Sequence, residues 1–62
     1  MGDQVTIIFR CPTKQPRILN DVKTIDIKKD SVIITGRGFR EIYFKDEIHS
    51  INADYNIGVY VK

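Results

Sequence analysis

The sequence predicts a small all-β fold: a five-stranded antiparallel sheet, barrel-like or strongly curled, with at most one or two short helical turns. Three observations predict it. Apolar and polar side chains alternate along five segments, which is the pattern of a strand with one buried face. The alternating residues are mainly isoleucine, valine, phenylalanine and tyrosine, which favour strands. Turn-forming residues separate the segments, and short strands with an apolar inner face close readily into a small barrel.

The first alternation covers residues 4–10. Its core face carries Val5, Ile7 and Phe9, whereas Ile8 falls on the opposite face. Pro12 has no backbone N–H and favours an extended residue before it, so the strand ends there.

The next three alternations form a meander. Residues 24–28 and 31–35 are joined by Lys29-Asp30, the spacing of a tight hairpin, and Ile33 is out of phase with the core. Gly36-Arg37-Gly38 supplies the positive φ that a second tight turn needs. In the strand at 41–45, the predicted core face carries Ile42 and Phe44, and the predicted outer face carries Tyr43.

The last alternation, residues 55–62, follows a turn at Asn52-Ala53-Asp54. Its core face carries Tyr55, Ile57, Val59 and Val61, which leaves Tyr60 on the outer face. Gly58 inside this strand predicts a bulge or a close backbone approach.

Two stretches have helical spacing instead. Ile18, Leu19, Val22 and Ile25 follow one such pattern, and Ile48 and Ile51 are three residues apart. Neither stretch is long enough for an independent helix. We expect at most one helical turn from each, at the open ends of the sheet.

The size of the chain limits what it can do. Its 62 residues predict one small β domain spanning 1–62, and domains of this size usually need a disulfide, a metal or a partner for stability. Cys11 is the only cysteine and His49 the only histidine. We therefore expect no disulfide, no metal site and no cofactor, and stability supplied by packing or self-association. The sequence shows neither a secretory signal nor an apolar run long enough for a membrane, which predicts a cytoplasmic protein.

Catalysis is not expected. No spacing groups the carboxylates with a base, and a Cys11–His49 pair is the only combination available for nucleophilic chemistry. A small barrel also has no interior left for a substrate once its core is filled. The sequence therefore predicts no catalytic residues and no small-molecule substrate.

A protein contact is the function that the pattern favours. Four apolar or aromatic side chains lie out of phase with the predicted core: Ile8, Ile33, Tyr43 and Tyr60. If they cluster, they form a patch of the kind that marks an interface with a protein partner or a second copy. An edge strand could serve the same purpose. The alternative is that the two helical turns, or the curvature of the sheet, cover this face.

Single-stranded nucleic-acid binding is the second hypothesis. The stretch from Arg37 to Phe44 resembles the RNP1 motif of RNA-recognition domains at five of its seven specified positions. It departs from that motif at Arg40, where a small residue is expected, and at Glu41, where an aromatic residue is expected. Basic side chains beside an aromatic ring suit a single strand. The residues predicted for this role are Arg10, Lys14, Arg37, Phe39 and Arg40.

Overall fold

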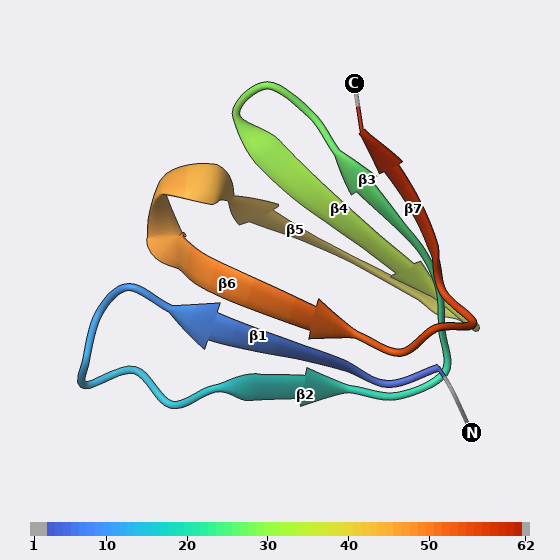
Figure 1. Cartoon of the computed structure of the whole chain (residues 1–62), viewed down its shortest axis with the longest axis horizontal. Coiled ribbons are helices and arrows are strands. Elements are labelled where there is room, and N and C mark those ends of the chain that lie inside the picture. The colour runs from blue at the N-terminus through green and yellow to red at the C-terminus, as the bar shows by residue number, and fades with distance from the viewer. Residues whose placement is uncertain (1–2, 62) are drawn as a thin grey trace.

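The computed structural model describes residues 3–61, which form two β-sheets packed against each other (Figure 1). The predicted all-β class is confirmed, but the count of five strands is not, because the described residues form seven strands. Among residues 3–61, no strand pairing joins the edges of the two sheets into a closed ring. The predicted barrel is therefore not confirmed either. No helix in this range is long and apolar enough to cross a membrane.

The three-stranded sheet has the order β2-β1-β6. The central strand β1 (Val5–Phe9) pairs antiparallel with β2 (Arg17–Leu19) on one side and with β6 (Ile48–Ala53) on the other. The first predicted strand is confirmed, with its three predicted core residues buried.

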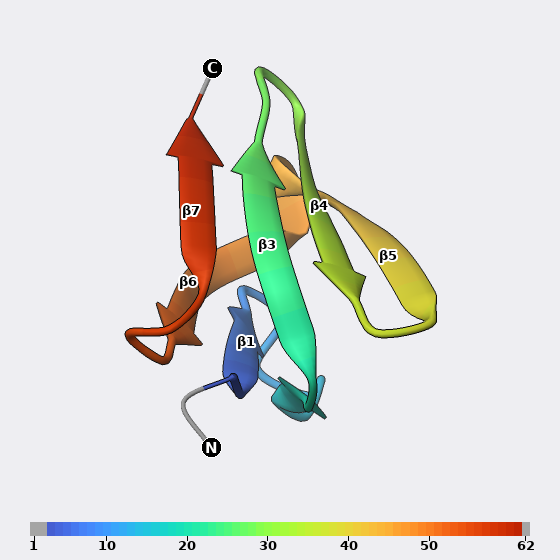
Figure 2. The same ribbon diagram turned by 90° about the vertical axis from the view of Figure 1, so that its right-hand side faces the viewer.

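The four-stranded sheet has the order β5-β4-β3-β7. It contains the predicted meander of β3 (Val22–Ile27), β4 (Ser31–Gly36) and β5 (Phe39–Phe44), in which neighbours pair antiparallel. The last strand, β7 (Gly58–Val61), returns to the other side of β3 and pairs with it in parallel. Figure 2 shows these four strands side by side, with the three-stranded sheet behind them.

The core lies between the two sheets. Each sheet contributes the apolar side chains of its inner face, and the loop before β7 adds one isoleucine. The buried residues are Val5, Ile7, Phe9, Leu19, Val22, Ile25, Val32, Ile34, Ile48 and Ile57.

Neither stretch with helical spacing is a helical turn. Arg17–Leu19 is strand β2, and Val22 and Ile25 belong to β3. The only helical turn described is the 3₁₀ turn η1 (Lys45–Glu47), which joins β5 to β6.

Two β-bulges produce the spacing of three. In β3, Val22 pairs with Gly36 and Thr24 pairs with Thr35, so Lys23 is an extra residue. In β6, Ile48 pairs with Phe9 and Ser50 with Ile8, so His49 is extra. Because an inserted residue reverses the alternation, two residues three apart then share one face. This is how Val22 and Ile25 both reach the core.

Strand β5 has the opposite phase to the prediction. Tyr43 lies opposite buried Val32, and Glu41 lies opposite buried Ile34, so both side chains belong to the inner face. The predicted core residues Ile42 and Phe44 point outward and are 62% and 65% exposed.

The glycines of the β4–β5 turn have different roles. Gly38 has a φ of 83°, which confirms the predicted positive φ in this turn. Gly36 is the last residue of β4, and a Cβ there would lie 2.1 Å from the Phe39 ring. Gly36 therefore lets Phe39 pack across the neighbouring strand.

Candidate interaction surfaces

The outer face of the four-stranded sheet carries a group of exposed apolar side chains. Pairing across the strands places Ile42 beside Ile33, Ile33 beside Asp26, and Asp26 beside Tyr60. Phe44 projects from the same face of β5, two residues after Ile42. We call Ile33, Ile42, Phe44 and Tyr60 the outer-face patch. Ile33 is half-buried in the sheet, whereas Tyr60 is 55% exposed.

The structure gathers only two of the four predicted interface residues. Ile33 and Tyr60 share the outer face, but Tyr43 points into the molecule. Ile8 lies in the other sheet, opposite Ser50, and is half-buried. Sequence reasoning missed Ile42 and Phe44. One sequence feature favours the observed phase. Phe39 and Tyr43 are four residues apart, so they lie on the same face of β5, and two aromatic residues on one face are typical of an inner face.

Strand β7 is exposed on both of its faces. Val59 and Val61 lie on the inner face of the sheet but are still 50% and 72% exposed. Tyr60 lies on the outer face. A Cβ at Gly58 would lie 3.1 Å from the Tyr60 ring. The neighbour at this glycine is therefore a tyrosine side chain of the same strand, and not the bulge or close backbone approach that the sequence predicted.

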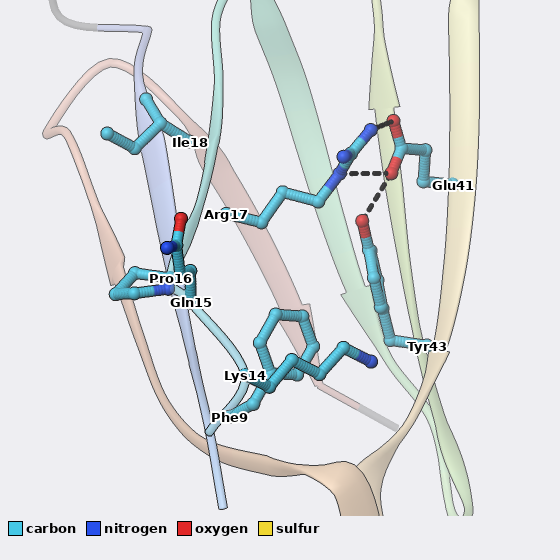
Figure 3. Close-up of a pocket in the computed structure, with 8 residues that line it drawn as sticks. All are labelled: Phe9, Lys14, Gln15, Pro16, Arg17, Ile18, Glu41 and Tyr43. Atoms are coloured by element: carbon cyan, nitrogen blue, oxygen red, sulfur yellow. Dashed lines mark hydrogen bonds and ion pairs between the residues drawn. The ribbon is translucent and has the colours of Figure 1, made fainter. Parts of the chain in front are cut away.

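A groove runs between the edge of β2 and the edge of β5 (Figure 3). Its volume is about 480 Å³, and both sheets and the β1–β2 loop line it. The lining residues are Phe9, Lys14, Gln15, Pro16, Arg17, Ile18, Glu41 and Tyr43. We call it the inter-sheet groove.

An ion pair connects the two walls of the inter-sheet groove. Arg17 on β2 donates from Nε and from Nη2 to the two carboxylate oxygens of Glu41 on β5, each at 2.9 Å. The Tyr43 hydroxyl donates to the same carboxylate. Glu41 can therefore occupy the inner face of its strand because a side chain from the other sheet matches its charge.

These contacts shift three pKa values. The hydrogen bond from Arg17, supported by that from Tyr43, lowers the pKa of Glu41, and the same pair raises the pKa of Arg17. Burial, together with the hydrogen bond to the Glu41 carboxylate, raises the pKa of Tyr43 to about 12. Near neutral pH the carboxylate is thus ionised and the phenol is protonated.

Two rings form the base of the inter-sheet groove. The centroids of Phe9 and Tyr43 lie 6.0 Å apart with a tilt of 52° between the rings, a separation typical of aromatic pairs. The Lys14 ammonium lies 4.3 Å from the Phe9 centroid. Contacts from β1, β5 and the β1–β2 loop therefore meet on this side of the molecule.

The residues predicted for nucleic-acid binding are dispersed. Arg10 and Lys14 lie in the β1–β2 loop, whereas Arg37 lies in the β4–β5 turn at the opposite end of the long axis (Figure 1). The Phe39 ring packs over Gly36 against the core, so it is not free to stack on a base. Arg40 projects from the opposite face of β5 to Phe39.

Cys11 is exposed in the β1–β2 loop, and its Sγ lies 3.1 Å from Oγ1 of Thr13. That hydrogen bond lowers the pKa of the thiol. The thiol is therefore partnered by a hydroxyl, while His49 is an exposed residue of β6.

Comparison of the chain with protein-family models, with curated proteins and with solved structures found no match.

Proposed function

We propose that this protein is a non-enzymatic interaction module that contacts another protein chain through the outer face of its four-stranded sheet. The outer-face patch carries this proposal. Ile42 and Phe44 are each more than 60% exposed, and they project from the same sheet face as Ile33 and Tyr60. Single exposed apolar residues are ordinary, but a group of them on one face is typical of a protein interface.

The composition of this face supports a protein contact. Aromatic and aliphatic side chains of the kind found here are common in interfaces, and charged residues are depleted at interface centres. In the row across the sheet, Asp26 is the one charged residue between Ile33 and Tyr60. Arg40 lies on the same face at the β5 edge, so the two charges can pair with complementary charges on the partner.

The chemistry of the inter-sheet groove supports a non-enzymatic role. General acids and bases work best with a pKa near the operating pH. In the groove, the pKa of Glu41 is lowered and that of Tyr43 is raised to about 12, so both move away from neutrality. We interpret these residues as a connection between the sheets.

The geometry favours a protein partner over a nucleic acid. Binding a single strand requires basic side chains and exposed rings along one continuous groove. Arg10 and Lys14 are at one end of the molecule and Arg37 at the other, and Phe39 is packed. The outer-face patch, in contrast, is already gathered.

The test compares two sets of serine variants. Ile42→Ser with Phe44→Ser removes the centre of the outer-face patch, and Ile18→Ser is the matched control because Ile18 is 57% exposed on the other sheet. We expect affinity capture to retain a specific protein with the wild type and the control. The double variant should lose that contact. Equal capture by the double variant and the wild type would contradict the proposal.

A further inference from the structure

We propose that β7 pairs antiparallel with β7 of a second copy of this chain, which joins the two four-stranded sheets into one continuous sheet. This inference goes beyond the proposed function, because it concerns the β7 edge and leaves the outer-face patch uncovered. Its basis is that β7 is the one sheet edge among residues 3–61 with no charged residue, no proline and no bulge.

The four sheet edges of the described chain differ in their protection. Edge strands in natural proteins are usually blocked by charged side chains, proline or a bulge. Strand β2 has Arg17 and follows Pro16, β5 carries Arg40 and Glu41, and β6 has a bulge at its pairing with β1. Strand β7 reads Gly-Val-Tyr-Val, with no charge, no proline and no bulge in its pairing with β3.

The exposure of β7 shows that no other part of residues 3–61 covers the strand. Val59, Tyr60 and Val61 are consecutive and are each at least half exposed. Valine and tyrosine are among the residues that strand pairing favours. The backbone and side chains of β7 are therefore suited to a further strand.

Charge favours a second copy at this edge. In a two-fold symmetric strand pair, a residue faces itself or a near neighbour of the same sequence. Charges of one sign placed opposite each other destabilise the pair. Self-pairing through β2 would bring two copies of Arg17 close together, whereas residues 58–61 place no charge against their own copy.

The alternation of side chains limits the possible registers. Residues directly opposite each other in an antiparallel pair share one face. Tyr60 is on the outer face, and Val59 and Val61 are on the other. Two registers of this kind each pair three of the four residues of β7, one centred on Val59 and one centred on Tyr60. We propose the second, which places Tyr60 opposite Tyr60 of the second copy and each Val59 opposite a Val61, because the first would place Gly58 opposite Tyr60. Aromatic and β-branched cross-strand pairs of this kind stabilise sheets.

The pairing extends the outer face without covering it. Tyr60 lies at the junction, and Ile42 and Phe44 remain on β5, at the far edge of each sheet. A strand pair of four residues buries little surface. We therefore expect a weak dimer, whose buried area lies at the low end of the range for specific interfaces. The dimer would present two outer-face patches on one side.

A cysteine cross-link tests the register. In a Cys11→Ser background, Tyr60→Cys places two thiols directly opposite each other across the symmetry axis. Opposite residues have Cα atoms about 4.5–5.5 Å apart, within the range of about 4.4–6.8 Å that a disulfide accepts. The control is Tyr55→Cys, because Tyr55 is 91% exposed but lies outside β7. We expect the Tyr60→Cys chain to form disulfide dimers about tenfold faster than the control, because pairing raises the local thiol concentration.

Val61→Lys provides an independent measurement. Val61 is 72% exposed, so lysine is tolerated in the monomer, while the added charge blocks the edge. We expect unchanged thermal unfolding at low concentration and loss of the dimer in sedimentation between about 10 µM and about 1 mM, the range of a weak interface. Association that persists in Val61→Lys, with equal cross-linking at the two cysteine positions, would overturn the β7 pairing and leave the outer-face proposal standing. A wild-type chain that stays monomeric throughout also overturns the pairing, and the capture experiment alone then decides the proposed function.

Discussion

The two edges of the four-stranded sheet contrast in how they are held. At the β5 edge, Glu41 is bound by Arg17 from the other sheet and Tyr43 packs on Phe9. At the β7 edge, Val59, Tyr60 and Val61 are at least half exposed. One side of the molecule is thus fixed by contacts between sheets, and the other side keeps its apolar strand accessible. This difference indicates that the inner face of β5 supports the fold, whereas β7 leaves its side chains accessible.

The largest expected effect compares two phenylalanines. Phe9 is 7% exposed and lies on the β5 side of the core, whereas Phe44 is 65% exposed on the outer face. Phe9→Ala should lower the free energy of unfolding by about 3–5 kcal/mol, because it removes a buried ring and leaves a cavity. Phe44→Ala should change it by about 0.5 kcal/mol at most. Urea denaturation measures both, and similar losses for the two variants would contradict the assignment of Phe44 to the surface.

The next effect compares two glycines. A Cβ at Gly36 would lie 2.1 Å from the Phe39 ring and 2.7 Å from the Asp21 carbonyl oxygen. Gly36→Ala should therefore cost about 1–3 kcal/mol of stability through overpacking. At Gly58 the nearest atoms belong to the Tyr60 ring, at 3.1 Å, and an exposed ring can move aside. Thermal unfolding should consequently show a smaller loss for Gly58→Ala, and the reverse order would contradict the packing described for β5.

The smallest effect concerns alkaline pH. The pKa of Tyr43 is raised from 10.0 to about 12, so the unfolded chain releases this proton first as the pH rises. The stability contributed by the protonated phenol is therefore present below pH 10 and is lost as the pH rises towards about 12. Urea midpoints over this range should fall more steeply in the wild type than in Tyr43→Phe. Tyr60→Phe is the matched control on the β7 side, and parallel curves for the wild type and Tyr43→Phe would exclude a partly buried, hydrogen-bonded phenol at Tyr43.

The sequence predicted most of the strands with a long alternation, and it missed β2, which has only three residues, and β6, which a bulge interrupts. The core faces of β1 and β4 follow from period two and are confirmed. An extra residue at Lys23 and another at His49 place apolar residues three apart on one face, a spacing that also describes a helix. A bulge depends on the partner strand, so the local sequence could not distinguish the two structures.

The candidate surface was only half predicted, for a related reason. Strand β5 has apolar residues on both of its faces, so either face could be the buried one. The prediction buried Ile42 and Phe44, which places the charge of Glu41 in solvent. The structure has the other phase because Arg17, distant in sequence, neutralises that carboxylate. Ile42 and Phe44 therefore join Ile33 and Tyr60 on the outer face. A long-range ion pair cannot be read from alternation alone.

The pairing of β1 with β6 has a consequence for the order of folding. The meander from Val22 to Phe44 needs only local hairpins, whereas β1 must wait for residues 48–53 before its second neighbour exists. Closing so long a loop costs entropy that local turns avoid. We expect the meander to form the folding nucleus and the N-terminal strand to join late, so that φ-values near Ile34 exceed those near Val5. During synthesis, the edge of β3 stays unpaired until β7 docks against it. Over that time, the edge of β3 can pair with a wrong strand.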